Sequence, residues 1–374
     1  MLKAGPQGLT PDGEKKKARV YTDGFFDFVH FSNAKLLWPA KQYGKKLIVG
    51  IHSDDELDNN GICPIFTDEE RYRLISAIRW VDEAFEDAPF QPEMSTLNQL
   101  DCDIIAIPGK CALAINLRGS RYISHPTTVE TARYEEIRGS DRAKQYVISE
   151  HVTDQEVAGR LMLVTKSHHM ETDSILEFKS AMLPFALDPV SNEPVISVSL
   201  FKQNYTFAPI VIGKKPKATD KVIYVSGAFD LFHAGHLSFL EAAKELGDYL
   251  IVGIVGDDDV NEEKGTIFPV MNLLERTLSV ASLKIVDEVF VGVPPITTTR
   301  FVNLIKPTKI AIYPETHPRR FAGCTQLGII KEVAPDYDAT CEEILERITS
   351  RKIASSEDDE IALFSGIPLN NNQH

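Results

Sequence analysis

The chain contains two copies of one sequence pattern, and this repeat constrains the fold more than any other feature. Residues 47–54 (LIVGIHSD) and 250–257 (LIVGIVGD) agree at six of eight positions, at an offset of 203. The same offset pairs four more positions: Gly24 with Gly227, Phe26 with Phe229, Asp27 with Asp230 and His30 with His233. Because the order and spacing are kept, we expect two tandem copies of one domain.

Each copy alternates short apolar runs with segments of helical periodicity. In the second copy, the runs that predict strands lie near residues 221–226, 249–255, 286–292 and 309–313. The segments between them that predict helices lie near residues 236–246, 271–283 and 297–305. Near-continuous apolar strands separated by helices predict an α/β fold with a doubly wound parallel sheet in each copy. Ligands of such folds bind beyond the carboxyl ends of the strands.

Composition shifts suggest the boundaries of these units. The first domain is expected over residues 18–170 and the second over 221–353. A structured linker is expected over 171–220, which is rich in proline: Pro184, Pro189, Pro194, Pro209 and Pro216. A disordered tail is expected over 354–374, because this segment is acidic and then rich in asparagine.

Charge and cysteine usage exclude several classes of protein. The formal net charge of −14 argues against a general binder of nucleic acid or of anionic membranes. No apolar run reaches the length of about 18 residues that predicts a membrane span. The five cysteines form no CxxC pair, so neither a disulfide framework nor a zinc site is predicted. The first residues lack an apolar signal core, which favours a cytoplasmic location.

The sequence His233-Ala234-Gly235-His236 follows a predicted strand and precedes a predicted helix. A helix N-terminus offers unpaired N–H groups and the positive end of a dipole. Imidazoles can donate hydrogen bonds to developing negative charge without carrying a permanent charge. Glycine lets the backbone approach a ligand closely. The turn therefore predicts a site that handles phosphate.

These motifs resemble those of the cytidylyltransferase superfamily. Residues 227–236 (GAFDLFHAGH) match its strand-turn-helix signature, and Glu275-Arg276-Thr277 matches its later Glu-Arg element. The tandem copies and the run at 159–169 (GRLMLVTKSHH) are similar to the ethanolamine-phosphate branch. The resemblance implies two Rossmann-like nucleotidyltransferase domains and the reaction of CTP with phosphoethanolamine to give CDP-ethanolamine and pyrophosphate, a step of phosphatidylethanolamine synthesis. It also implies Mg²⁺ with the CTP, no metal ligands from the protein, contact with the endoplasmic reticulum surface, and a homodimer as one open arrangement.

The resemblance places the catalytic residues in the second copy: His233, His236, Lys264 and Arg276. It places the nucleotide contacts on the following residues: Ala228, Phe229, His233, Ala234, Gly235, His236, Lys264, Tyr313, Thr316, Ala339, Thr340 and Cys341. Alternatives stay open for three of these assignments. Lys264 could be an ordinary exposed lysine, and Arg276 could form a salt bridge on a helix surface. The acidic run 257–259 could hold a metal or an ammonium group, but a helix start is favoured.

The chain departs from the family pattern in both copies. The first copy has His30-Phe31-Ser32-Asn33 at the turn, Asn59-Asn60-Gly61 in place of Lys-Gly, Pro108-Gly109 in place of His-Gly, and residues 148–155 in place of a triphosphate-binding loop. The second copy keeps its histidines but has Tyr313-Pro-Glu-Thr316 and Asp338-Ala-Thr-Cys341 at two later elements. Three functions follow: an enzyme that uses the second copy, an impaired relative that binds CTP or regulates a partner, or nucleotidyl transfer to another alcohol phosphate such as choline phosphate.

Overall fold

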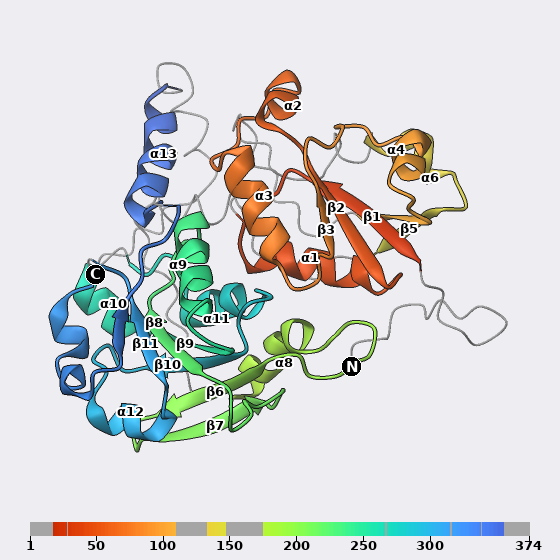
Figure 1. Ribbon diagram of the computed structural model, residues 1–374. Helices are drawn as coiled ribbons and strands as arrows, with labels where there is room; N and C mark the ends of the chain where they lie inside the picture. Colours follow the sequence, from red (N-terminus) through yellow and green to blue (C-terminus); the bar gives the residue numbers. More distant parts are fainter. Residues whose placement is uncertain are drawn as a thin grey trace, which may run out of the picture.

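The computed structural model describes residues 18–27, 29–109, 133–146, 175–265, 268–314, 316–337 and 339–354. Within these ranges the chain forms two separate β-sheets with helices packed on both (Figure 1). The expected tail beyond residue 354, the run at 159–169 and the segment at 148–155 lie outside the described residues.

The first sheet has five parallel strands in the order β3-β2-β1-β4-β5. The strands are β1 (Arg19–Gly24), β2 (Lys46–Ile51), β3 (Glu83–Phe85), β4 (Ile104–Pro108) and β5 (Ala143–Tyr146). The helices of this half are α1 (Phe31–Lys41), α2 (Asp54–Asn59), α3 (Asp68–Ala77), α4 (Met94–Gln99) and α6 (Glu135–Arg138).

The second sheet repeats this arrangement in the order β10-β9-β8-β11-β12. Its strands are β8 (Val222–Gly227), β9 (Tyr249–Val255), β10 (Glu288–Val293), β11 (Lys309–Ile312) and β12 (Ile330–Glu332). Its helices are α9 (Ala234–Lys244), α10 (Asp257–Lys264), α11 (Leu273–Ala281), α12 (Thr299–Ile305) and α13 (Cys341–Ala354), with two short 3₁₀ helices, η1 (Pro318–Phe321) and η2 (Thr325–Leu327). The matching strand orders confirm the predicted duplication and the predicted α/β class.

The segment expected as a linker is built into the second sheet. It contains α8 (Ile175–Ala186), β6 (Ser197–Lys202) and β7 (Thr206–Val211). Strand β6 pairs in parallel with β10, and β7 pairs antiparallel with β6, so the second sheet has seven strands. The proline at 209 lies on β7, which is the edge strand, where a missing N–H costs no ladder bond.

A single hydrophobic cluster joins the two halves. It contains Val49 and Leu74 of the first half, Val252 and Leu278 of the second, and Phe185 of α8. Helices α1, α8 and α11 pack against one another, and α3 packs against α9, so these helices form a shared layer between the sheets (Figure 1). The outer face of each sheet is covered by its own smaller cluster.

Capping residues recur at the same place in both copies. Thr67 and Glu70 form a capping box at the start of α3, and Asn272 and Glu275 form one at the start of α11. Each box satisfies two N–H groups that the helix itself leaves unpaired. Among the described residues, no helix is both long and apolar enough to span a membrane.

Candidate active site

The turn between β8 and α9 is held in shape by the buried carboxylate of Asp230. This carboxylate accepts hydrogen bonds from the backbone N–H groups of Val270 (2.7 Å) and Met271 (2.8 Å), which precede α11. A third bond comes from the N–H of Leu231 at 3.1 Å. Phe229 of this turn has a left-handed backbone with φ of 51°, which is uncommon for a bulky side chain. The predicted ordering role of Asp230 is confirmed.

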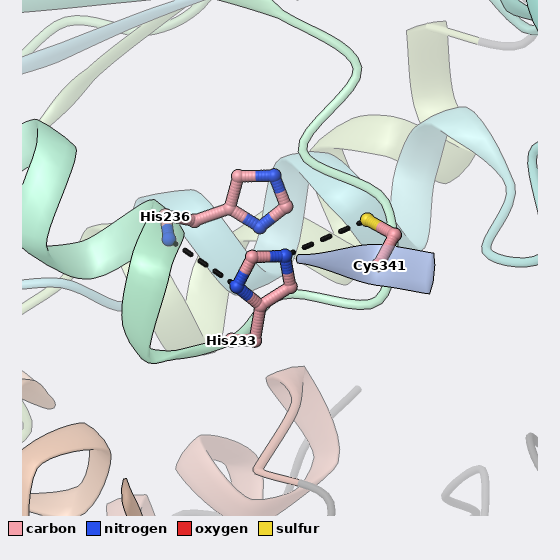
Figure 2. A group of neighbouring side chains, drawn as sticks. All are labelled: His233, His236 and Cys341. Carbon is pink, nitrogen blue, oxygen red and sulfur yellow. Dashed lines mark hydrogen bonds between the residues drawn. The ribbon is translucent and has the colours of Figure 1, made fainter. Parts of the chain in front are cut away.

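His233 begins helix α9 as its N-cap residue. Its backbone is extended, and its Nδ1 accepts a hydrogen bond from the N–H of His236 at 3.4 Å. A neutral imidazole that accepts at Nδ1 carries its proton on Nε2. The Nε2 of His233 lies 3.5 Å from the Sγ of Cys341 (Figure 2). This thiol lies 3.2 Å from the carbonyl oxygen of Asp230. The thiol can therefore donate to Asp230 while it accepts from His233.

The two imidazole rings of the turn lie against each other. The centroids of His233 and His236 are 3.9 Å apart, and the ring planes are inclined by 25°. The rings of Phe229 and Phe232 lie 5.4 and 5.5 Å from the ring of His236. Nδ1 of His236 is covered and has no hydrogen-bond partner in the described part of the chain. The site therefore holds an unsatisfied polar atom, which a bound group could satisfy.

Burial keeps both imidazoles neutral. Burial, together with the smaller effect of the positive charges of Lys264 and Arg347, lowers the pKa of His233 to about 3. Burial also lowers the pKa of His236 well below its usual value, and His233 and Lys264 contribute in the same direction. At neutral pH, two uncharged imidazoles are thus surrounded by two cationic side chains, an arrangement that suits a negatively charged ligand.

The loop before α13 packs directly on the turn. A Cβ atom on Gly235 would lie 2.2 Å from the carbonyl oxygen of Ala339. The chain's own backbone thus makes a close approach to this glycine, and a contact of Gly235 with a ligand stays a prediction. Thr340 exchanges hydrogen bonds with Glu343 and caps the start of α13. The structure therefore brings Ala339 and Cys341 to the histidine turn, and the predicted contact of this loop with a nucleotide stays a prediction.

Three further residues predicted to contact the nucleotide, Lys264, Tyr313 and Thr316, differ in how exposed they are. Lys264 is exposed at the end of α10, with its Nζ 5.7 Å from the ring centroid of Phe268. Its positive charge lowers the pKa of both histidines. Tyr313 packs edge-on against Phe239 of α9, with centroids 6.1 Å apart. Thr316 donates its backbone N–H to the carbonyl oxygen of Tyr313. A contact between a nucleotide and any of these side chains stays a prediction.

Arg276 is buried beneath the site and acts as a clamp. Its guanidinium donates to the carbonyl oxygens of Met271 (3.0 Å), Ala228 (2.5 Å) and Val255 (2.8 Å), and to the carboxylate of Asp257 at 2.6 Å. The alternative of a surface salt bridge is wrong, because the arginine side chain is fully covered. Arg276 instead ties the ends of β8 and β9 to the loop before α11.

The acidic run after β9 starts helix α10. Asp257 lies in the first turn, where it accepts from the N–H of Leu273 and pairs with Arg276. Asp258 and Asp259 complete the same turn. Carboxylates at a helix N-terminus are stabilised by the dipole. The favoured interpretation of this run as a helix start is therefore confirmed.

The matching edge of the first sheet is filled by side chains that sequence analysis did not single out. The Arg133 guanidinium donates to the buried carboxylate of Asp23 at 2.8 Å and lies 2.7 Å from the Nε2 of His52. It also lies 5.4 and 5.0 Å from the ring centroids of Phe25 and Phe90. At an offset of 203, the second copy has serine and valine in place of Asp23 and His52. This difference between the two copies is the feature of the sequence that could have indicated the cluster.

The first half also supports the second site directly. Arg347 of α13 pairs with the buried Glu70 of α3 at 2.6 Å. Arg73 of α3 pairs with both Glu241 of α9 and Asp336, each at 2.7 Å. The loop that carries Cys341 is thus held between a first-half helix and the histidine turn. These pairs join residues far apart in the sequence, so no local motif could indicate them.

Known proteins share this architecture. The family described as Cytidylyltransferase-like matches residues 21–174 and 224–347, which together make up most of the chain. The chain therefore belongs to the cytidylyltransferase-like family, and both of its halves carry the family's domain.

Curated relatives resemble the chain over nearly its whole length. Ethanolamine-phosphate cytidylyltransferase of Mus musculus is 32% identical over 94% of this chain and 90% of its own length. The enzyme of the same name from Dictyostelium discoideum is 34% identical over 91% of this chain and 92% of its own length. That of Arabidopsis thaliana is 30% identical over 90% of this chain and 81% of its own length. The similarity to proteins of this name thus extends over both sheets and the segment between them.

Proposed function

We propose that the chain transfers the cytidylyl group of CTP to phosphoethanolamine, giving CDP-ethanolamine and pyrophosphate, at the turn between β8 and α9. The observation that carries the proposal is the pair of neutral imidazoles at the N-terminus of α9, beside the carboxyl ends of β8 and β9. Relatives named for this reaction match the chain over 94% and 91% of its length. The reaction is a step in the synthesis of phosphatidylethanolamine.

The chemistry is a direct displacement at the α-phosphorus of CTP. A phosphate oxygen of phosphoethanolamine forms the new P–O bond, and the bond to the pyrophosphate oxygen breaks. No protein nucleophile is needed, so the chain contributes alignment and stabilisation of charge. His233 and His236 supply N–H donors to the phosphate oxygens. Lys264 supplies a point charge for the departing pyrophosphate.

Mg²⁺ fits this site as a companion of the triphosphate. Magnesium keeps several waters and usually binds one or two carboxylates together with substrate phosphates. Asp257 is committed to Arg276 and to the N–H of Leu273, whereas Asp258 and Asp259 lie on the same first turn of α10. We propose that the ion enters with CTP, where it neutralises charge on the phosphates, and that the protein does not hold it alone.

A second candidate function is nucleotide binding without turnover. What favours it is that Nε2 of His233 faces the thiol of Cys341, while Ala339 covers Gly235. In that state fewer donors face a nucleotide, and each lost donor costs a factor of about 10² to 10³ in turnover. Transfer to choline phosphate is a third candidate, and the same assay tests it with a different acceptor.

The deciding experiment measures CDP-ethanolamine formation by wild type, His236→Ala and His30→Ala. His30 is the first-copy equivalent of His233, and its variant is the control for a histidine lost from the first turn. We expect His236→Ala to lower kcat by about 10² to 10³, because a charge-stabilising donor is lost. His30→Ala should leave kcat nearly unchanged. Equal losses in both variants, with folding intact, would contradict a second-half active site.

Calorimetry with CTP separates binding from turnover. If wild type binds CTP and forms no product with either acceptor, the second candidate replaces the first. If choline phosphate is the better acceptor, transfer to choline phosphate replaces the first candidate function.

A cytoplasmic location with access to the endoplasmic reticulum surface suits the pathway. The chain's acidic charge argues against nucleic acid as a partner. A homodimer is proposed as the state to test by light scattering.

A further inference from the structure

The histidine turn contains a set of metal-ligand atoms that the proposed reaction does not use. One ligand atom from each of His233, His236 and Cys341 lies within 4.8 Å of the others (Figure 2). Among the described residues, this is the group of histidine, cysteine and acidic side chains close enough to hold a metal ion. The relevant distance between His233 Nε2 and Cys341 Sγ is already 3.5 Å.

The chemistry of these donors selects the metal. Two imidazoles and one thiolate suit Zn²⁺ and other borderline or soft cations, whereas Mg²⁺ prefers oxygen ligands. Three protein ligands with an open fourth position are typical of accessible zinc sites. Within the described ranges, Nδ1 of His236 has no hydrogen-bond partner, so a metal bond there would displace no hydrogen bond between described residues. The first copy has Asn33 where His236 lies in the second, so the set belongs to the second half alone.

We propose that His233, His236 and Cys341 bind Zn²⁺, and that the zinc-bound form excludes CTP. The cation forms a bond to Sγ, and the thiol proton leaves to solvent as the S–H bond breaks. Nε2 of His233 gives its proton to solvent while Nδ1 takes one up, so the ring stays neutral and Nδ1 no longer accepts from the N–H of His236. The two rings must turn out of their present stack so that both point at one ion, and the thiol must release the carbonyl oxygen of Asp230. Binding therefore releases one proton and weakens as the pH falls.

Competition follows from the shared side chains and rests on the proposed function. The imidazole nitrogens that bind zinc are those assigned to the CTP phosphates, so one imidazole cannot serve both. Zinc would thus act as a reversible inhibitor that is competitive with CTP. Loss of zinc would restore the site without any change in the fold.

The first experiment needs no nucleotide. Co²⁺ is titrated into the full chain as a spectroscopic substitute for zinc, and the expected result is a thiolate-to-cobalt charge-transfer band that Zn²⁺ abolishes. Cys341→Ser should remove the band and weaken Zn²⁺ binding at least ~10-fold, as the loss of even an outer partner does. Cys324→Ser is the matched control, because Cys324 is also buried in the second half and its thiol donates a hydrogen bond to the carbonyl oxygen of Phe321.

The outcomes are distinguishable. A band that persists in Cys341→Ser, or that disappears in Cys324→Ser, overturns the site. His236→Ala provides a second variant, and it should retain the thiolate band with weaker affinity. Thermal unfolding of each variant shows that it is folded. In a second arm, CTP is added to the Zn²⁺ titration: competition supports both proposals, while zinc binding that CTP does not affect leaves the metal site in place and contradicts its role in excluding nucleotide.

Discussion

The two halves of the chain share a fold and differ in what fills the carboxyl edge of the sheet. In the first half, the guanidinium of Arg133 lies between aromatic rings and pairs with the buried Asp23. In the second half, two neutral imidazoles and a thiol occupy the turn. The carboxyl edge is thus filled by the Arg133 guanidinium in the first copy, whereas uncharged imidazoles and a thiol lie at this edge in the second copy. On the proposed function, the second copy carries the chemistry and the first copy supports it through α3.

The largest expected effect comes from removing the arginine that fills the carboxyl edge of the first sheet. Arg133→Ala leaves the carboxylate of Asp23 buried without its partner, and burial already raises the pKa of Asp23. Removing one partner of a buried pair costs about 3 to 5 kcal/mol of unfolding free energy. Urea unfolding measures this change.

The double variant Arg133→Met with Asp23→Asn is the control for the Arg133 experiment. It should recover part of the loss, because no orphaned charge remains. A double variant that is as unstable as Arg133→Ala would show that packing against the rings, and not the ion pair, holds this edge closed.

A smaller effect is expected from a methyl group at the histidine turn. Gly235→Ala places a Cβ against the carbonyl oxygen of Ala339, which is backbone and cannot rotate away. Forcing an extra methyl into such a contact costs about 1 to 3 kcal/mol. The first copy already has Ser32 at the equivalent position, so Ser32→Ala should be nearly neutral there. Thermal unfolding of both variants checks the contrast, and equal shifts would contradict it.

The pH dependence of stability compares one buried histidine in each half. Burial lowers the pKa of His52 and of His233 to about 3 in the folded chain, below the usual value of 6.5. The unfolded chain therefore binds more protons in this window, so stability is fully present above pH 6.5 and is lost as the pH falls toward 3. Well inside this pH window, each histidine changes the free energy of unfolding by about 1.4 kcal/mol per pH unit.

Urea unfolding between pH 6 and pH 5 measures this slope. His52→Gln should reduce the slope by about half of the joint contribution of the two histidines. An unchanged slope in the variant would mean that His52 is already protonated in the folded chain.

The sequence predicted features that depend on local pattern. The strands after residues 221, 249, 286 and 309 and the helices between them appear where apolar periodicity placed them. The turn at Asp230 and the helix start at Asp257 follow from side chains that bond to nearby backbone, which short-range chemistry can indicate. The repeat predicted that both copies contain the same parallel sheet, and the matching order of five strands confirms this.

What the sequence could not supply depends on long-range pairing. The strands of the expected linker carry no signal for which sheet edge they join. Asp23, His52 and Arg133 meet only because the ends of β1 and β2 and the segment before α6 converge. Arg276 matched a motif, yet its burial turned an expected ligand contact into a clamp on the backbone. The pair of Arg347 with Glu70 crosses between the two copies.

The strand β6, which covers β10, sets a limit on how this molecule can be divided. A fragment that starts at residue 221, where the repeat begins, would expose the whole edge of β10 to solvent. A long uncovered edge recruits other chains and invites aggregation. The smallest piece that can be expected to remain monodisperse when expressed alone must therefore begin before residue 197, and the boundary suggested by the duplication is not a place to cut.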